Sequence, residues 1–253
     1  MNHKIKTQRT EGFTIIELVL AMTLISLLLL GIAMTIVQIA NIYNHGMIVK
    51  EVNQTSRSVG DELTAALRTN GSFSTDPSAN RYVQKPWGGR LCVGQYSYIW
   101  NYGKAVNDGD TRRNTFASPV SAGTGLNLVK KADGSRSYEI GFVKVPDSGG
   151  NYCTPNGSGV YPPIDSTIAT ELLKTGNHSL VFHDFTVVST STAKDTLSDQ
   201  QLYSFSYVIG TSDFEALDDT QTTCKTPGQS GADPNYCSVE KFTLVLRSLS
   251  GVN

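Results

Sequence analysis

A long apolar run near the start of this 253-residue chain gives way first to an amphipathic helical pattern and then to short β-type runs. No charged residue interrupts the 23 positions from Leu18 to Ala40. About 20 helical residues are enough to cross the hydrocarbon core of a bilayer. The Thr and Ser residues within the run can hydrogen-bond to their own helix, which lowers their cost in lipid. We therefore predict a transmembrane segment over about residues 18–40.

Beyond Ala40 the sequence becomes more polar, but the helical period continues. Apolar residues recur at spacings near three, four and seven, as in a helix with one buried face: Ile42, Val49, Val52, Val59, Leu63, Ala66 and Leu67. Asn70-Gly71 is a helix stop signal. The pattern predicts one helix over residues 13–70, with its first half in a membrane and its second half packed under a head.

The remaining residues, 71–253, predict a β-rich globular head. Tyr203, Phe205 and Tyr207 alternate with serines, which is typical of a half-buried antiparallel strand. Predicted strands cover residues 96–102, 137–145, 180–189, 202–209 and 239–246. Residues 71–95 are interpreted as a loop, and residues 103–134 and 146–176 as long insertions, which are often functional in compact domains. One long helix followed by strands predicts an α+β fold, with the helix packed on an antiparallel sheet.

The charge distribution predicts the orientation of the chain in the membrane. Residues 1–12 form a short leader that carries Lys4, Lys6 and Arg9 against a single carboxylate, whereas the whole chain has a net charge of −1. A basic leader before an apolar run favours a cytoplasmic N-terminus and an exported head. The near-neutral total gives no general field that would attract nucleic acid or an anionic membrane surface.

Four cysteines follow the apolar run, on the side of the membrane predicted to be exported. An even number in that compartment favours disulfides, and three connectivities are possible. Cys224 and Cys237 enclose a Pro- and Gly-rich loop that suits a local bridge, worth roughly 3 kcal/mol in the chain-entropy model. We therefore favour Cys224–Cys237, which leaves Cys92–Cys153, although the sequence does not choose among the connectivities.

Glu17 distinguishes the apolar run from an ordinary anchor, because a carboxylate at the edge of such a run is costly in lipid and usually marks a function. It belongs to the stretch Gly12-Phe13-Thr14-Ile15-Ile16-Glu17. After a short basic leader, this stretch closely resembles the processing site of type IV prepilins and type II secretion pseudopilins. A secretory signal peptide is the competing interpretation, but it would have a shorter apolar core followed by a cleavage site.

The resemblance implies several roles, which we state as expectations. A prepilin peptidase cuts between Gly12 and Phe13 and methylates the new amine of Phe13. Glu17 pairs with the N-terminal amine of a neighbouring subunit and sets the register of assembly; an apolar filament core would penalise the carboxylate if it were unpaired. The implied partners are other pilin subunits, the peptidase, a platform protein with its assembly ATPase, and membrane lipid. The expected location is the cytoplasmic membrane, and then an extracellular or periplasmic filament.

One departure favours a particular class within this family. Major pilins commonly carry a proline about two-thirds along the apolar run, but Met34 stands at that position and residues 1–76 contain no proline. This favours a minor pilin or pseudopilin, and the stretch around residues 57–68 resembles the larger minor pseudopilins of the J/W type. The alternative function is a binding module at a pilus tip, an adhesin or a DNA-uptake receptor, which the long insertions suggest.

Enzymatic chemistry finds little support in the sequence, so we expect no catalytic site, metal or cofactor. His178 and His183 have an odd spacing, which on a strand would place them on opposite faces, unsuited to a shared metal. The aromatic run from Tyr96 to Tyr102, with Arg112 and Arg113 nearby in sequence, could stack bases or sugars. An ordinary core strand is the interpretation that we favour for this run.

Overall fold

The structure is a computed structural model, and the residues that it describes are 12, 14–85, 88–102, 141–159, 161–162, 164, 168–173, 180–189, 200–213, 215–218, 220 and 222–249. The chain forms two compact units, residues 1–44 and 45–253. A single helix, α1 (Ile15–Thr69), contributes to both units. Its bounds agree closely with the predicted helix, whereas nearly all of the leader lies outside the described residues.

In the first unit, the described apolar side chains of α1 are exposed. It is the one described helix that is long and apolar enough to cross a membrane. None of its most apolar 18-residue stretch is buried. Thr23, Ser26 and Thr35 each donate a side-chain hydrogen bond to a carbonyl three or four residues earlier in the helix. The predicted mechanism for tolerating these hydroxyl groups in lipid is therefore present.

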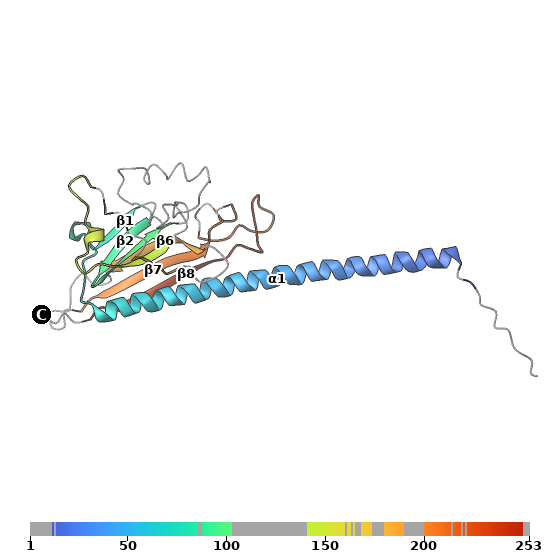
Figure 1. Ribbon diagram of the computed structural model, residues 1–253, viewed down its shortest axis with the longest axis horizontal. Helices are drawn as coiled ribbons and strands as arrows, with labels where there is room; N and C mark the ends of the chain where they lie inside the picture. Colours follow the sequence, from blue (N-terminus) through green and yellow to red (C-terminus); the bar gives the residue numbers. More distant parts are fainter. Residues whose placement is uncertain are drawn as a thin grey trace, which may run out of the picture. The chain divides into compact units, whose positions relative to one another are not determined.

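The described residues of the second unit form two antiparallel sheets (Figure 1). The first has the strand order β1-β2-β3-β4-β5 and the second the order β6-β7-β8. Two short 3-10 helices, η1 (Pro77–Ala79) and η2 (Asn151–Cys153), lie in the loops. The strands are β1 (Tyr82–Lys85), β2 (Gly88–Val93), β3 (Tyr96–Asn101), β4 (Phe142–Pro146), β5 (Thr170–Glu171), β6 (Leu180–Ser189), β7 (Leu202–Thr211) and β8 (Val239–Arg247).

The C-terminal half of α1 packs on these sheets and completes the core of the second unit. Figure 1 shows this part of the helix running beside β7 and β8. Val52, Val59, Leu63 and Leu67 are buried in one cluster with the aromatic residues of β3, β6 and β7. A side chain at Gly60 would lie 3.0 Å from Leu244 of β8. The predicted α+β arrangement, a long helix packed on antiparallel sheets, is thus confirmed, with two sheets in place of one.

The inward faces of β7 and β8 follow the alternation predicted from sequence. Tyr203, Phe205 and Tyr207 are fully buried, while the serines between them are only partly covered. On β8, every second residue from Phe242 to Leu246 packs against the core. The aromatic run on β3 is also mostly core: Tyr98 and Trp100 have no exposed surface, whereas Tyr96 is 37% exposed. The core interpretation is thus confirmed for all of the run except Tyr96.

The interpretation of residues 71–95 as a loop was wrong, because η1, β1 and the whole of β2 lie there. β2 is buried on both faces and therefore shows no alternation. Its Gly88-Gly89 start also looks like a turn, but Gly89 lies where a side chain would collide with the Trp100 ring, 2.2 Å away. The stretch 146–176 likewise holds η2 and β5. The insertion 103–134 lies outside the described residues.

Candidate functional site: the start of α1 and the disulfide-bonded head

Thr14 and Glu17 form a reciprocal cap at the start of α1. The backbone N–H and the hydroxyl of Thr14 donate to Glu17 Oε2 at 3.3 and 3.0 Å, and the Glu17 N–H donates back to Thr14 Oγ1 at 3.3 Å. Leu18 N–H donates to the Thr14 carbonyl at 3.2 Å, which is the first helical hydrogen bond. This is a capping box, which satisfies amide donors that a helix start otherwise leaves unpaired.

The capping box leaves Glu17 exposed within an apolar surface. Ile15 and Ile16 are 84% and 71% exposed. A carboxylate in this position can pair with a cationic group of a neighbouring molecule, because the hydroxyl and amide of Thr14 do not use all of its hydrogen-bond acceptor sites. Gly12 is also exposed, and a side chain there would meet no atom within 4 Å. Phe13, the expected new N-terminus, lies outside the described residues.

The apolar run draws attention to Glu17 but not to Thr14 as its partner. The signal was present, because Thr14-Ile-Ile-Glu17 has the T-x-x-E spacing of a capping box before an apolar run. Glu17 thus has a local role in this structure in addition to the assembly role that the resemblance implies. These two roles make different demands on the side chain, since a capping box accepts Gln at the same position, whereas an ion pair requires the charge.

Both disulfides that the sequence favoured are present. Cys92 pairs with Cys153 across a sequence separation of 61, and Cys224 pairs with Cys237 across 13. The second bond lies at a small buried cluster that contains Ala216, Leu217 and Cys237. The first bond is buried and joins β2 to η2.

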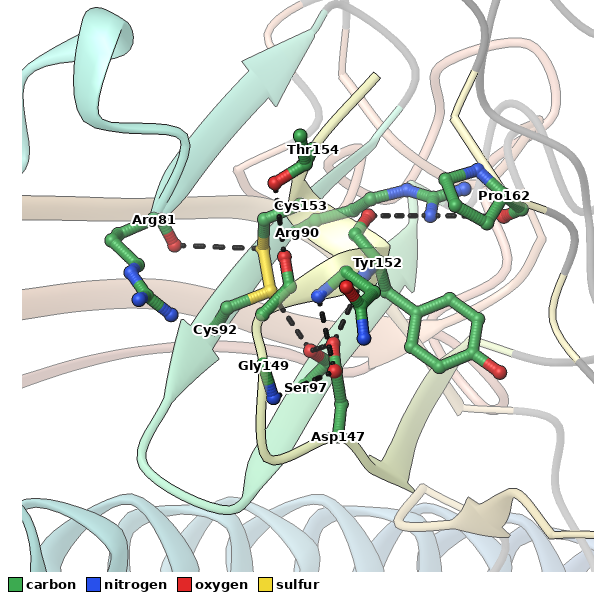
Figure 2. The surroundings of a disulfide bond; sticks show 12 residues. Arg81, Arg90, Cys92, Ser97, Asp147, Gly149, Tyr152, Cys153, Thr154 and Pro162 are labelled. Atoms are coloured by element: carbon green, nitrogen blue, oxygen red, sulfur yellow. Dashed lines mark hydrogen bonds between the residues drawn. A yellow bond between two sulfur atoms is a disulfide. The ribbon is translucent and has the colours of Figure 1, made fainter. Parts of the chain in front are cut away.

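Asp147 organises the loop that carries Cys153 (Figure 2). Its carboxylate accepts the Ser97 hydroxyl at 2.6 Å and the backbone N–H groups of Gly149, Asn151 and Tyr152 at 3.3, 3.0 and 2.9 Å. Burial raises the pKa of Asp147, but these hydrogen bonds outweigh it and hold the pKa below its ordinary value. The carboxylate is therefore charged at neutral pH, and its hydrogen bonds to three backbone amides hold the loop in place.

Arg90 of β2 hydrogen-bonds to the same loop. It is completely buried, and its Nη1 donates to the carbonyls of Tyr152 and Pro162 at 2.7 and 3.2 Å. The guanidinium also lies over the Tyr161 ring, 5.0 Å from its centroid. Burial lowers the pKa of Arg90 to about 10, so the group stays charged at neutral pH. The sequence singles out neither residue: Arg90 binds backbone carbonyls distant in sequence, and Asp147 binds the amides of its own loop together with the distant Ser97 hydroxyl.

The other candidate residues that the structure describes do not assemble into a catalytic set. His183 lies on β6, and its Nε2 is 3.1 Å from the Thr211 carbonyl, a structural contact. His178 and the Arg112–Arg113 pair lie outside the described residues. Within the described ranges, no group of three His, Cys, Asp or Glu side chains is arranged to hold a metal.

Comparison with known proteins gives no match for this chain: neither a protein-family model, nor a curated protein, nor a solved structure resembles it significantly.

Proposed function

We propose that this chain is a minor subunit of a type IV pilus or of a related type II secretion or competence filament. The observation that carries the proposal is the junction between the Gly12–Glu17 motif and a continuous helix whose first half is apolar and uncovered. Such a surface is stable only in lipid or against other apolar helices. The β-rich head with two disulfides is compatible with export to an oxidising compartment.

In this proposal a prepilin peptidase cleaves after Gly12 and methylates the amine of Phe13. Before assembly, the subunit resides in the cytoplasmic membrane with its N-terminus in the cytoplasm and its head exported. A platform protein and an assembly ATPase then transfer it from lipid to the filament, where its partners are other pilin subunits. The protein acts as a structural unit and not as an enzyme.

Glu17 would set the register of assembly by pairing with the positive N-terminal amine of a neighbouring subunit. Buried in an apolar filament core, its carboxylate would otherwise be uncompensated, and an unpaired buried charge is strongly unfavourable. Since Thr14 already contacts this carboxylate, the intermolecular pair would add to the capping box or replace its Thr14 contacts.

The first experiment tests processing. The chain is expressed in cells with an active prepilin peptidase, and the purified protein is examined by N-terminal sequencing and intact mass. We expect a chain that begins at N-methylated Phe13, and an uncut chain in cells with an inactive peptidase. A protein that still begins at Met1 beside an active peptidase would contradict the proposal.

The second experiment separates the assembly role of Glu17 from its capping role. Glu17→Gln keeps the capping geometry but removes the charge, whereas Thr14→Val removes the cap but keeps the charge. We expect Glu17→Gln to insert into the membrane normally and to lose most of its incorporation into filaments, while Thr14→Val retains much of it. The reverse order of the two variants would show that Glu17 acts only as a cap.

A further inference from the structure

The two disulfides of the head pose different closure problems. Cys224 and Cys237 are 13 residues apart, so a flexible chain brings them together readily. Cys92 and Cys153 are 61 apart, and the entropy cost of closing a loop rises with its length. The described part of the longer loop includes β3 and β4. Closure of the Cys92–Cys153 bond therefore benefits from structure that holds the two sulfur atoms near each other.

The first sheet brings Asp147 to the Cys92 side. Cys92 on β2 is the register partner of Ser97 on β3, and Ser97 is the register partner of Val145 on β4. Asp147 follows β4 directly, and its N–H donates to the Gln95 carbonyl in the β2–β3 turn at 2.8 Å. As a result, Ser97 Oγ lies both 2.6 Å from the Asp147 carboxylate and 2.8 Å from Cys92 Sγ.

Asp147 then turns the chain back towards Cys92. Its carboxylate gathers the N–H groups of Gly149, Asn151 and Tyr152, and Cys153 follows Tyr152 directly. Gly150 takes φ of 69°, where a side chain would also meet Arg81, 2.3 Å away. The Cys153 N–H closes the turn by donating to the Gly150 carbonyl at 3.1 Å. Figure 2 shows Asp147 and Cys153 at the two ends of this turn, with the disulfide from Cys92 joining β2 to the loop.

We propose that Asp147 is the positioning residue for oxidative closure of the Cys92–Cys153 bond, which forms only on the folded first sheet, whereas Cys224–Cys237 closes locally. In this step two thiols lose two protons and two electrons, and one S–S bond forms. A disulfide oxidant, such as oxidised glutathione, accepts them and becomes two thiols. The Asp147 carboxylate exchanges no proton in this step and acts only by holding the loop. The inference does not depend on the proposed filament role.

Oxidative refolding of the full chain in detergent micelles tests this proposal. The reduced, unfolded protein is diluted into a buffer of oxidised and reduced glutathione, quenched with a thiol-alkylating reagent at intervals, and digested for mass spectrometry. Each cysteine pair then reports its own rate. For Asp147→Ala we expect Cys92–Cys153 to close at least about tenfold more slowly, because charge-assisted hydrogen bonds of this kind are worth more than a factor of ten in an equilibrium. The Cys224–Cys237 rate should not change.

Two further variants provide the controls. Asp147→Asn keeps one carbonyl oxygen as an acceptor and should fall between the wild type and Asp147→Ala. Asp218→Ala removes a matched carboxylate that accepts the N–H groups of Thr222 and Thr223 beside Cys224, and should leave the Cys92–Cys153 rate at its wild-type value. If Asp147→Ala does not fold, the pair-specific rates of Asp147→Asn decide. Equal slowing of both pairs, or no slowing of either, would overturn the proposal.

Discussion

Lys144 on β4 places its ammonium nitrogen 2.6 Å from Glu62 Oε1 on α1, and the Tyr98 hydroxyl donates to the same oxygen at 2.7 Å. The side chains of Lys144 and Glu62 are 23% and 25% exposed. Burial raises the pKa of Glu62, but the hydrogen bonds and the charge of Lys144 outweigh it and hold the pKa below its ordinary value. The contacts of Glu62 with Lys144 and Tyr98 thus attach the C-terminal half of α1 to the first sheet.

Replacing Glu62 by Gln should weaken this attachment in a pH-dependent way. A depressed folded-state pKa gives stability that is complete above the unfolded-state pKa and is lost as pH falls through the folded-state pKa. We expect Glu62→Gln to lower the free energy of unfolding by about 1 kcal/mol at neutral pH and by much less in strong acid. Denaturant titration of the full chain in micelles, followed by tryptophan fluorescence, measures both values.

The comparison between wild type and variant is essential, because Asp147 also has a depressed pKa and contributes acid sensitivity of the same sign. Only the difference between the two proteins isolates Glu62. A difference that stays constant from neutral pH to strong acid would contradict an electrostatic role for this carboxylate.

Tyr207 provides a second attachment, between the helix and the other sheet. Its hydroxyl donates to the Ser56 carbonyl of α1 at 2.8 Å, and burial raises its pKa to about 12. We expect Tyr207→Phe to cost about 1 kcal/mol of unfolding free energy, because the ring still packs but the hydrogen bond is lost. Tyr43→Phe, at a tyrosine that is 66% exposed, is the matched control and should change the value little. Equal effects in both variants would contradict this assignment.

Two glycines of α1 should respond to substitution in opposite directions. A side chain at Gly46 would meet no atom within 4 Å, so Gly46→Ala should stabilise the helix by up to about 1 kcal/mol. Gly60 packs beneath Leu244 and Tyr207, so Gly60→Leu should destabilise the second unit by about 1–3 kcal/mol through overpacking. Thermal unfolding by circular dichroism compares the two variants, and stabilisation by Gly60→Leu would contradict the close approach of β8.

The parts of the fold predicted from sequence are those in which one face is buried. The C-terminal half of α1 buries one face and β7 alternates from Leu202 to Tyr207, so their apolar positions reveal them. The prediction was wrong for Ile42, which is 74% exposed. β2 could not be found in this way, since all its residues are buried and its glycines serve a contact with Trp100 that lies in another strand. The pairing of Cys92 with Cys153 was favoured only after the short loop had been assigned to the other two cysteines.

The candidate site shows the same division. Glu17 stands out in sequence because it is a charge beside an apolar run, whereas Asp147 and Arg90 look like ordinary surface residues. Their importance comes from backbone amides and carbonyls, which carry no signature in the sequence. Asp147 meets Ser97 only because β3 and β4 pair in one particular register, and Arg90 reaches Tyr152 only because η2 folds back over β2.

The two disulfides should open in a fixed order under a reducing agent. Cys92 and Cys153 are both buried, whereas Cys224 is only partly covered. Reduction also requires a thiolate to leave, and the charged Asp147 carboxylate, one hydroxyl away from Cys92 Sγ, disfavours a negative charge there. We expect a phosphine reductant to open Cys224–Cys237 first in the folded protein, with Cys92–Cys153 opening about tenfold or more slowly. Differential alkylation followed by peptide mapping measures both rates, and unfolding in denaturant should remove most of the difference. If Cys92–Cys153 opened first in the folded chain, neither its burial nor its carboxylate neighbour would be protecting it.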